Sequence, residues 1–299
     1  MSSAETLLAQ AVAAFNAGDH RTAADRFERA ASVLAAVRPG DAVLALESAS
    51  RLRMMLDQPH HAQLAITKAA TLEPDSPRIV RLQAELADKG GDLDARRAAW
   101  RAVAERGERN EQRAAHVRLG YLAREAADIA ASADHFAAAA DLADDDDARG
   151  EIRIEVAIAK TQLGDRDGAI KVLDSITTPA HTARVLGQRG IIALMGGDAD
   201  GALAFAEQAR KAAVATNDVM TYLATASLIA IVHEQAGRLV DAYDTYIRAR
   251  ESLVQLLGDH AKGLVQPAIQ LFEERLGKEK FDVVWQDWVT RARQRRGQA

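Results

Sequence analysis

A small-large-small pattern that recurs seven times constrains the fold of this chain more than any other feature. In the first copy, AGDHRTAADRFERA, Gly18 is followed at offsets of 5, 9 and 12 by Ala23, Phe27 and Ala30. The later copies begin at positions 57, 91, 127, 164, 197 and 237, which gives intervals of 39, 34, 36, 37, 33 and 40 residues. A period of that length, filled with helix-forming residues, predicts a series of stacked helical hairpins.

Each position of the pattern has a role in packing. The glycine ends the first helix of a hairpin, because glycine takes the left-handed conformation without steric cost. The aspartate that often follows suits the start of the second helix, through capping and through its charge. The residue at offset 5 is small because the two helices cross there. The residue at offset 9 is large and fills the gap to the next hairpin. The residue at offset 12 lies on the same face of the helix and is again small. Besides the first copy, the residues that best fit these roles are Ala62, Ala69, Trp100, Phe136, Gly164, Ala169, Gly197, Ala202, Gly237, Ala242 and Tyr246.

The pattern resembles the tetratricopeptide repeat (TPR) family over residues 4–258. Leu119 and Gly120 match the Leu-Gly pair of that family's first helix, and Pro74 matches the proline that ends a repeat. Arg96 and Ser132 depart from the family by replacing the alanine at the helix crossing. The resemblance implies an all-α, right-handed superhelical solenoid of about seven hairpins, with repeats that start near residues 4, 43, 77, 113, 150, 183 and 223.

Residues 259–299 are predicted to form a capping pair of helices separated at Gly277. Phe272, Phe281, Val284 and Trp285, together with Leu276 and Trp288, supply an apolar face for the last hairpin. A solenoid needs such an end, because an exposed terminal repeat would aggregate. This segment also resembles the end of helical arrays in large bacterial transcriptional regulators.

Composition supports an all-α chain and excludes several kinds of chemistry. Hydrophobic residues make up 48% of the sequence but aromatic residues only 4%, and much of the remainder is alanine, the best helix former. The net charge of −5 argues against a general nucleic-acid binder. The absence of cysteine removes disulfides, thiolate nucleophiles and cysteine-bound zinc. The N-terminus lacks signal-peptide features and no apolar run is long enough to span a bilayer, so we expect a cytoplasmic protein with no membrane span.

No catalytic, cofactor or metal site is predicted. The acidic run Asp144–Asp147 lacks the glycine and glutamate of a calcium loop, and we interpret it as a turn ahead of a helix that begins near Arg149. His60 and His61 are adjacent, and such neighbours on a turn do not converge on one metal ion. There is neither a phosphate-binding glycine loop nor a nucleophile elbow, so we expect a protein that is not an enzyme.

Candidate partner-binding residues follow from the family's register, in which first helices line a concave groove. In the second to fourth repeats this surface is rich in arginine, whose planar fork suits carboxylates. The residues are Glu47, Arg51, Arg78, Arg81, Glu85, Arg118, Tyr121 and Arg124. The surface is mostly apolar in the fifth to seventh repeats, where the residues are Ile154, Ile158, Ile191, Ser227, Leu228 and Ile231. An alternative is that the arginines only keep the surface soluble.

These features predict a non-enzymatic scaffold or adaptor for protein–protein interaction. Its partner would be a protein or peptide segment, acidic toward the arginines and apolar toward the isoleucines. One alternative is a TPR-type regulatory sensor of a short signalling peptide. Another is an accessory subunit of an enzyme complex.

Overall fold

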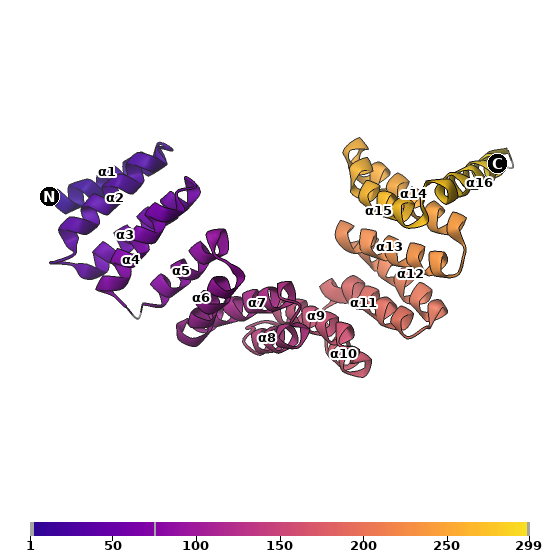
Figure 1. Ribbon diagram of the computed structural model, residues 1–299, viewed down its shortest axis with the longest axis horizontal. Coiled ribbons are helices and arrows are strands. Elements are labelled where there is room, and N and C mark those ends of the chain that lie inside the picture. Colours follow the sequence, from indigo (N-terminus) through magenta and orange to yellow (C-terminus); the bar gives the residue numbers. More distant parts are fainter. Residues whose placement is uncertain (1–2, 75, 298–299) are drawn as a thin grey trace. The chain divides into compact units, whose positions relative to one another are not determined.

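Helices account for all regular structure in the computed structural model, which describes residues 3–74 and 76–297. These residues form sixteen α-helices and two short 3-10 helices and contain no strand, which confirms the predicted all-α class. The chain divides into two compact units, Met1–Asp145 and Asp146–Ala299. Within each unit, consecutive helices pack side by side as hairpins (Figure 1).

The first unit contains four hairpins. Its helices are α1 (Ser3–Asn16), α2 (His20–Leu34), α3 (Pro39–Met55), α4 (Pro59–Leu72), α5 (Pro77–Gly90), α6 (Leu93–Arg106), α7 (Arg109–Glu125) and α8 (Ile129–Asp141).

The second unit contains three further hairpins and a terminal helix pair. Its helices are α9 (Asp146–Gln162), α10 (Arg166–Asp174), η1 (Pro179–His181), α11 (Thr182–Met195), α12 (Ala199–Thr216), α13 (Val219–Gln235), α14 (Leu239–Leu257), η2 (Asp259–Ala261), α15 (Lys262–Leu276) and α16 (Lys278–Gly297). The predicted boundary after residue 258 falls at the turn between α14 and η2, and as a domain boundary it stays a prediction.

The left-handed turn that ends the first helix is present in six of the seven hairpins. Gly18, Gly164, Gly197 and Gly237 have φ between 72° and 81°. Asp57 and Ala127 hold the same conformation, with φ of 55° and 58°, although a β-carbon makes it costly. The third hairpin differs, because Gly91 is extended with φ of −80°.

Aspartate caps open most of the second helices, as the sequence predicts. The side chains of Asp19, Asp92, Asp128, Asp165 and Asp198 each accept a hydrogen bond from the backbone N–H three residues later, at 2.8–3.1 Å. Each cap satisfies a helical N–H that has no partner within its own helix.

Small residues at the helix crossing are fully buried. Ala23, Ala62, Ala169, Ala202 and Ala242 have no exposed surface, and the same holds for Ser132. Arg96 occupies this position in the third hairpin, where its guanidinium bonds Asp88 and Glu125 instead. The hairpins therefore close on a side chain no larger than serine at every crossing except the third.

The large position of the pattern is buried in most hairpins. Phe136, Ile66, Leu173, Trp100 and Tyr246 are all buried. A β-carbon on Gly120 would lie 2.9 Å from the Phe136 ring, so this glycine lets α7 approach α8 closely. Phe27 is only partly buried where the pattern predicts a buried side chain, although it packs against two apolar clusters.

The terminal pair packs on α14 through aromatic rings. Tyr243 meets Phe281 and Trp288 edge to face, with centroids 5.5 Å apart in both pairs, and the Trp288 indole N–H donates to Asp244 at 2.8 Å. Phe272 and Val284 are buried against the same cluster. Trp285 is 48% exposed, so it does not belong to the apolar face that the sequence assigns it to.

The acidic run forms a turn followed by a helix that starts earlier than predicted. Helix α9 begins at Asp146, three residues before Arg149, and Asp146 and Asp147 lie in its first turn. Carboxylates there interact favourably with the positive end of the helix dipole, which explains why the helix extends into the run.

Two histidines that are far apart in sequence meet between α7 and α8. Their Nδ1 atoms, on His116 and His135, lie 3.2 Å apart, so one ring donates and the other accepts. Burial lowers the pKa of both rings; His116, Arg101 and Arg97 lower the pKa of His135 further, and Asp134 opposes them. Both rings therefore take up a proton at a lower pH than an exposed histidine does.

Replacing Ala127 with glycine should stabilise the first unit. The left-handed conformation is free of strain for glycine, and after the entropy cost of glycine we expect a gain of about 0.5–1 kcal/mol in urea unfolding. Ala126→Gly is the matched control, because Ala126 has an ordinary φ of −81° and should gain nothing. An equal gain in both variants would contradict this account.

The α7–α8 hairpin should loosen in mild acid. Because the pKa of both histidines is lowered in the folded state, the unfolded chain takes up protons first, and stability is lost as pH falls below the ordinary value of 6.5. Amide hydrogen exchange of α7 and α8, corrected for intrinsic rates, should speed up between about pH 7.5 and about pH 5.5. The double variant His116→Asn and His135→Asn should lose this response and His60→Asn should keep it. A response that survives the double variant would assign it to other groups.

Candidate binding surface on the first helices

The predicted basic residues of the second and third hairpins line a hollow in the first unit. Its volume is about 420 Å³ and its walls come from α3, α5 and α7. We call it the basic hollow, and it is lined by Leu44, Glu47, Ser48, Arg51, Arg78, Arg81 and Glu111. Sequence periodicity does not single out Leu44, Ser48 and Glu111, because the residues of neighbouring helices that face one hollow depend on how the helices pack.

Acidic neighbours balance most of the arginine charge in the basic hollow. Glu47 binds Arg51 at 2.9 Å, and Arg81 binds Glu85 at 2.9 Å and approaches Glu111 to 3.7 Å. Arg78 is exposed and makes no ion pair with any residue in the described ranges. The hollow is thus a mixed-charge surface in which Arg78 is the most available cation.

The remaining predicted residues of this surface, Glu85, Arg118, Tyr121 and Arg124, do not line the basic hollow. Arg118 binds Asp88 at 2.8 Å, and Arg124 lies over the rings of Tyr121 and Phe136, at 5.6 and 5.2 Å from the ring centroids. Tyr121 packs edge to face on Phe136 and keeps part of its ring exposed. Arg118 thus links α7 to α5 of the third hairpin, whereas Arg124 and Tyr121 pack within the fourth hairpin.

The predicted apolar residues line a second hollow, which belongs to the second unit. We call it the apolar hollow; its volume is about 320 Å³, and its walls come from α9, α11 and α13. It is lined by Ile154, Ile158, Arg184, Gly187, Gln188, Ile191, Met220, Thr221, Ala224, Thr225 and Leu228. Ile154 and Leu228 form a buried floor, whereas Met220 is 73% and Ile191 40% exposed. Ile231 does not line it.

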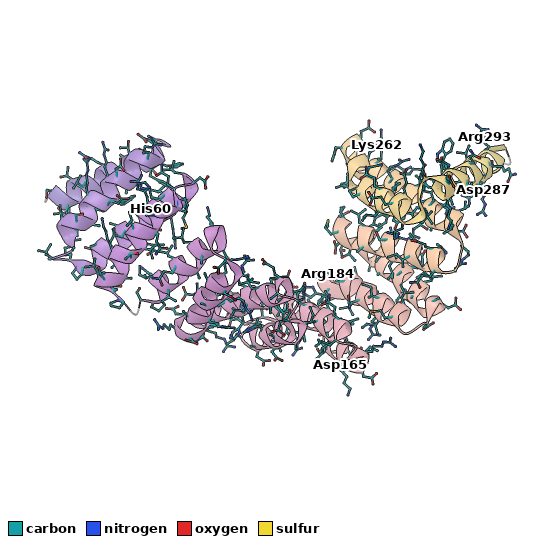
Figure 2. All side chains as sticks on the ribbon, viewed as in Figure 1. His60, Asp165, Arg184, Lys262, Asp287 and Arg293 are labelled. Atoms are coloured by element: carbon teal, nitrogen blue, oxygen red, sulfur yellow. The ribbon has the colours of Figure 1, made fainter. Side chains whose placement is uncertain are left out.

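Polar groups in the apolar hollow are already bonded within the protein. The Gln188 amide donates to Thr161, Thr225 donates to the carbonyl of Tyr222, and Thr221 donates to the cap residue Asp218. Arg184, labelled in Figure 2, approaches Glu155 to 3.7 Å at the edge. With its polar atoms satisfied, the surface suits apolar side chains.

A glycine explains how α11 and α13 come close enough to form the apolar hollow. A β-carbon on Gly190 would lie 2.8 Å from Leu228 and 3.3 Å from the backbone of α12. Sequence periodicity does not single out Gly190, because a glycine inside a helix has no periodic signal of its own.

A larger hollow of about 620 Å³ lies away from the first helices. Its walls are the start of α14 and one side of α16, and an ion pair between Arg291 and Asp241 crosses it at 3.0 Å. Charged residues of both signs line it, including Asp287, which Figure 2 labels. This mixture of charges does not indicate which kind of ligand the hollow would bind.

No group of three or more potential metal ligands occurs among the residues that the structure describes. His60 and His61 have rings 6.1 Å apart in an edge-on arrangement, and both are exposed. None of the described helices has the length and apolarity needed to cross a membrane.

Solved structures share this fold at low sequence identity, whereas no family model and no curated protein matches the chain. A tetratricopeptide repeat protein from Parabacteroides merdae is 14% identical with a TM-score of 0.55, and the match covers 91% of this chain and 99% of the other. A Rap protein complexed with competence and sporulation factor is 12% identical with a TM-score of 0.51, over 97% and 87%. YrrB, a TPR protein with an unusual peptide-binding site, is 14% identical with a TM-score of 0.50, over 64% and 94%.

These likenesses agree with the hairpin geometry described above. The left-handed turns, the capped second helices and the buried alanines at the crossings explain this fold without reference to the similar structures. The chain has the helical-repeat fold of the tetratricopeptide repeat proteins.

Proposed function

We propose that this protein is a non-enzymatic scaffold that binds a segment of another protein or a peptide on its first helices. The apolar hollow is the observation that carries the proposal. Three successive first helices present exposed Met220 and Ile191 above a buried floor. Gln188, Thr221, Thr225 and Arg184, which also line it, each have a hydrogen bond or an ion pair within the protein. Such a surface gains free energy by burying apolar side chains of a partner.

The basic hollow is proposed as a second contact, for a carboxylate of the partner. Arg78 and Arg51 are exposed, and a guanidinium binds a carboxylate in a bidentate geometry. Glu47 and Glu111 would compete with an acidic partner, so this hollow should contribute selectivity more than affinity. Each hollow belongs to its own unit, and each contact is tested separately.

A peptide sensor is the second candidate function. The Rap structure that this chain resembles holds competence and sporulation factor, and YrrB has a peptide-binding site. A sensor would bind a short peptide and change compactness on binding, whereas a scaffold would bind a folded protein with little change. Small-angle scattering with and without the captured partner distinguishes the two.

Charges introduced into the apolar hollow should weaken partner capture. We expect the double variant Ile191→Glu and Met220→Glu to bind at least about tenfold more weakly, because burial of each side chain is worth about 1.5–3 kcal/mol. The measurement is an affinity pulldown from the native cell, quantified by mass spectrometry. Ile170→Glu is the matched control, since Ile170 is equally an exposed isoleucine but lies on the second helix α10. A partner that binds all three proteins alike would remove this hollow from the proposal.

Charge reversal in the basic hollow should weaken binding mainly at low salt. With the captured partner, the double variant Arg51→Glu and Arg78→Glu should lose about 1.5–3 kcal/mol if the contacts are desolvated, and less if they stay at the rim. The difference in affinity between the wild type and the double variant should shrink at high salt, because exposed charges are screened. Arg21→Glu on α2 serves as the control. Unchanged affinity at low salt would leave the apolar hollow as the sole contact.

A further inference from the structure

The third hairpin replaces apolar contact with ion pairs at its crossing. Arg96 takes the position that alanine or serine holds in the other hairpins, and its side chain is 16% exposed. Its guanidinium bonds both carboxylate oxygens of Glu125, at 2.9 and 3.1 Å, and reaches Asp88 at 3.4 Å. Glu125 ends α7 and Asp88 lies near the end of α5, so one side chain of α6 links the two neighbouring first helices.

Asp88 is the shared centre of this network. Its second oxygen accepts from Arg118 of α7 at 2.8 Å, while the first faces Arg96. Two arginines and two carboxylates thus form a neutral cluster within the first unit. Half of the Glu125 side chain is exposed, so salt can reach part of the cluster.

Apolar packing of α6 is correspondingly thin. Only Trp100 and Val103 are buried on this helix, whereas α2 of similar length buries five residues. The Trp100 indole nitrogen is buried and has no hydrogen-bond partner among the described residues, which costs free energy. The preceding turn also lacks the left-handed residue of the other hairpins. The helix therefore depends on the ionic network more than its neighbours do.

We propose that α6 is an ionic joint, a helix that detaches locally from α5 and α7 as its charges are screened while the adjacent hairpins stay packed. Segments with few buried apolar contacts open at lower free energy than the rest of a fold. Detachment of α6 would affect its hairpin partner α5, which supplies Arg78 and Arg81 to the basic hollow. The ionic joint is a property of the chain without a partner, so its test does not depend on the proposed function.

Amide hydrogen exchange of the full chain, measured at two salt concentrations, tests the joint. Raising sodium chloride from about 0.01 M to about 1 M shortens the Debye length from about 30 Å to about 3 Å. Exchange in α6 should become about fivefold faster, while exchange in α4, which has the buried Ala62 at its crossing and no ion pair among the described residues, should change little. Equal responses of the two helices, or no response of α6, would overturn the proposal.

Two variants separate the network from the general charge of α6. Arg96→Ala restores the small crossing residue and removes the arginine that links α5 to Glu125, so the salt response of α6 should vanish. Arg101→Ala, on the same helix at an exposed position without an ion pair to any described residue, should keep the wild-type response. A response that survives Arg96→Ala, or is lost in Arg101→Ala, contradicts the joint. The wild-type salt comparison decides the matter even if Arg96→Ala fails to fold.

Discussion

Contact between two helices at a residue without a large side chain is the constraint on which the rest of this structure depends. Ala23, Ala169 and Ala202 have no exposed surface, and any longer apolar side chain there would force the helices apart. Because the hairpins close this tightly, their first helices can stand next to one another. The hollows on those helices are therefore consequences of the crossing, although none of the crossing residues lines them.

The third hairpin shows the cost of departing from that constraint. Arg96 cannot be buried without partners, so Asp88 and Glu125 come from both flanking helices to hold it. Ion pairs at partly exposed sites contribute little net stability and weaken with salt, unlike the alanine contacts that they replace. A single substitution in the repeat thus changes the kind of force that holds a hairpin, which apolar content alone would not reveal.

Charge on the first helices is more balanced than its distribution along the sequence implies. The sequence predicts an arginine-rich surface that includes Arg51, Arg81 and Arg118. In the structure each of these arginines has an acidic side chain close by. Glu111 reaches Arg81 from another hairpin, so no local pattern predicts that contact. In the apolar hollow the polar groups are satisfied within the second unit, Thr221 and Thr225 at their own helix and Gln188 by Thr161 of α9.

The sequence by itself determined the helical hairpins, their caps and most buried positions, because these depend on residues a few positions apart. Gly164 with the Asp165 cap, or Ala169 with Leu173, can be read from spacing alone. Only the tertiary structure decided that His116 meets His135, that Arg96 is held by Asp88 and Glu125, and that Trp285 stays exposed. These contacts join residues that are distant in sequence or depend on how one helix rotates against another, and helical periodicity fixes neither.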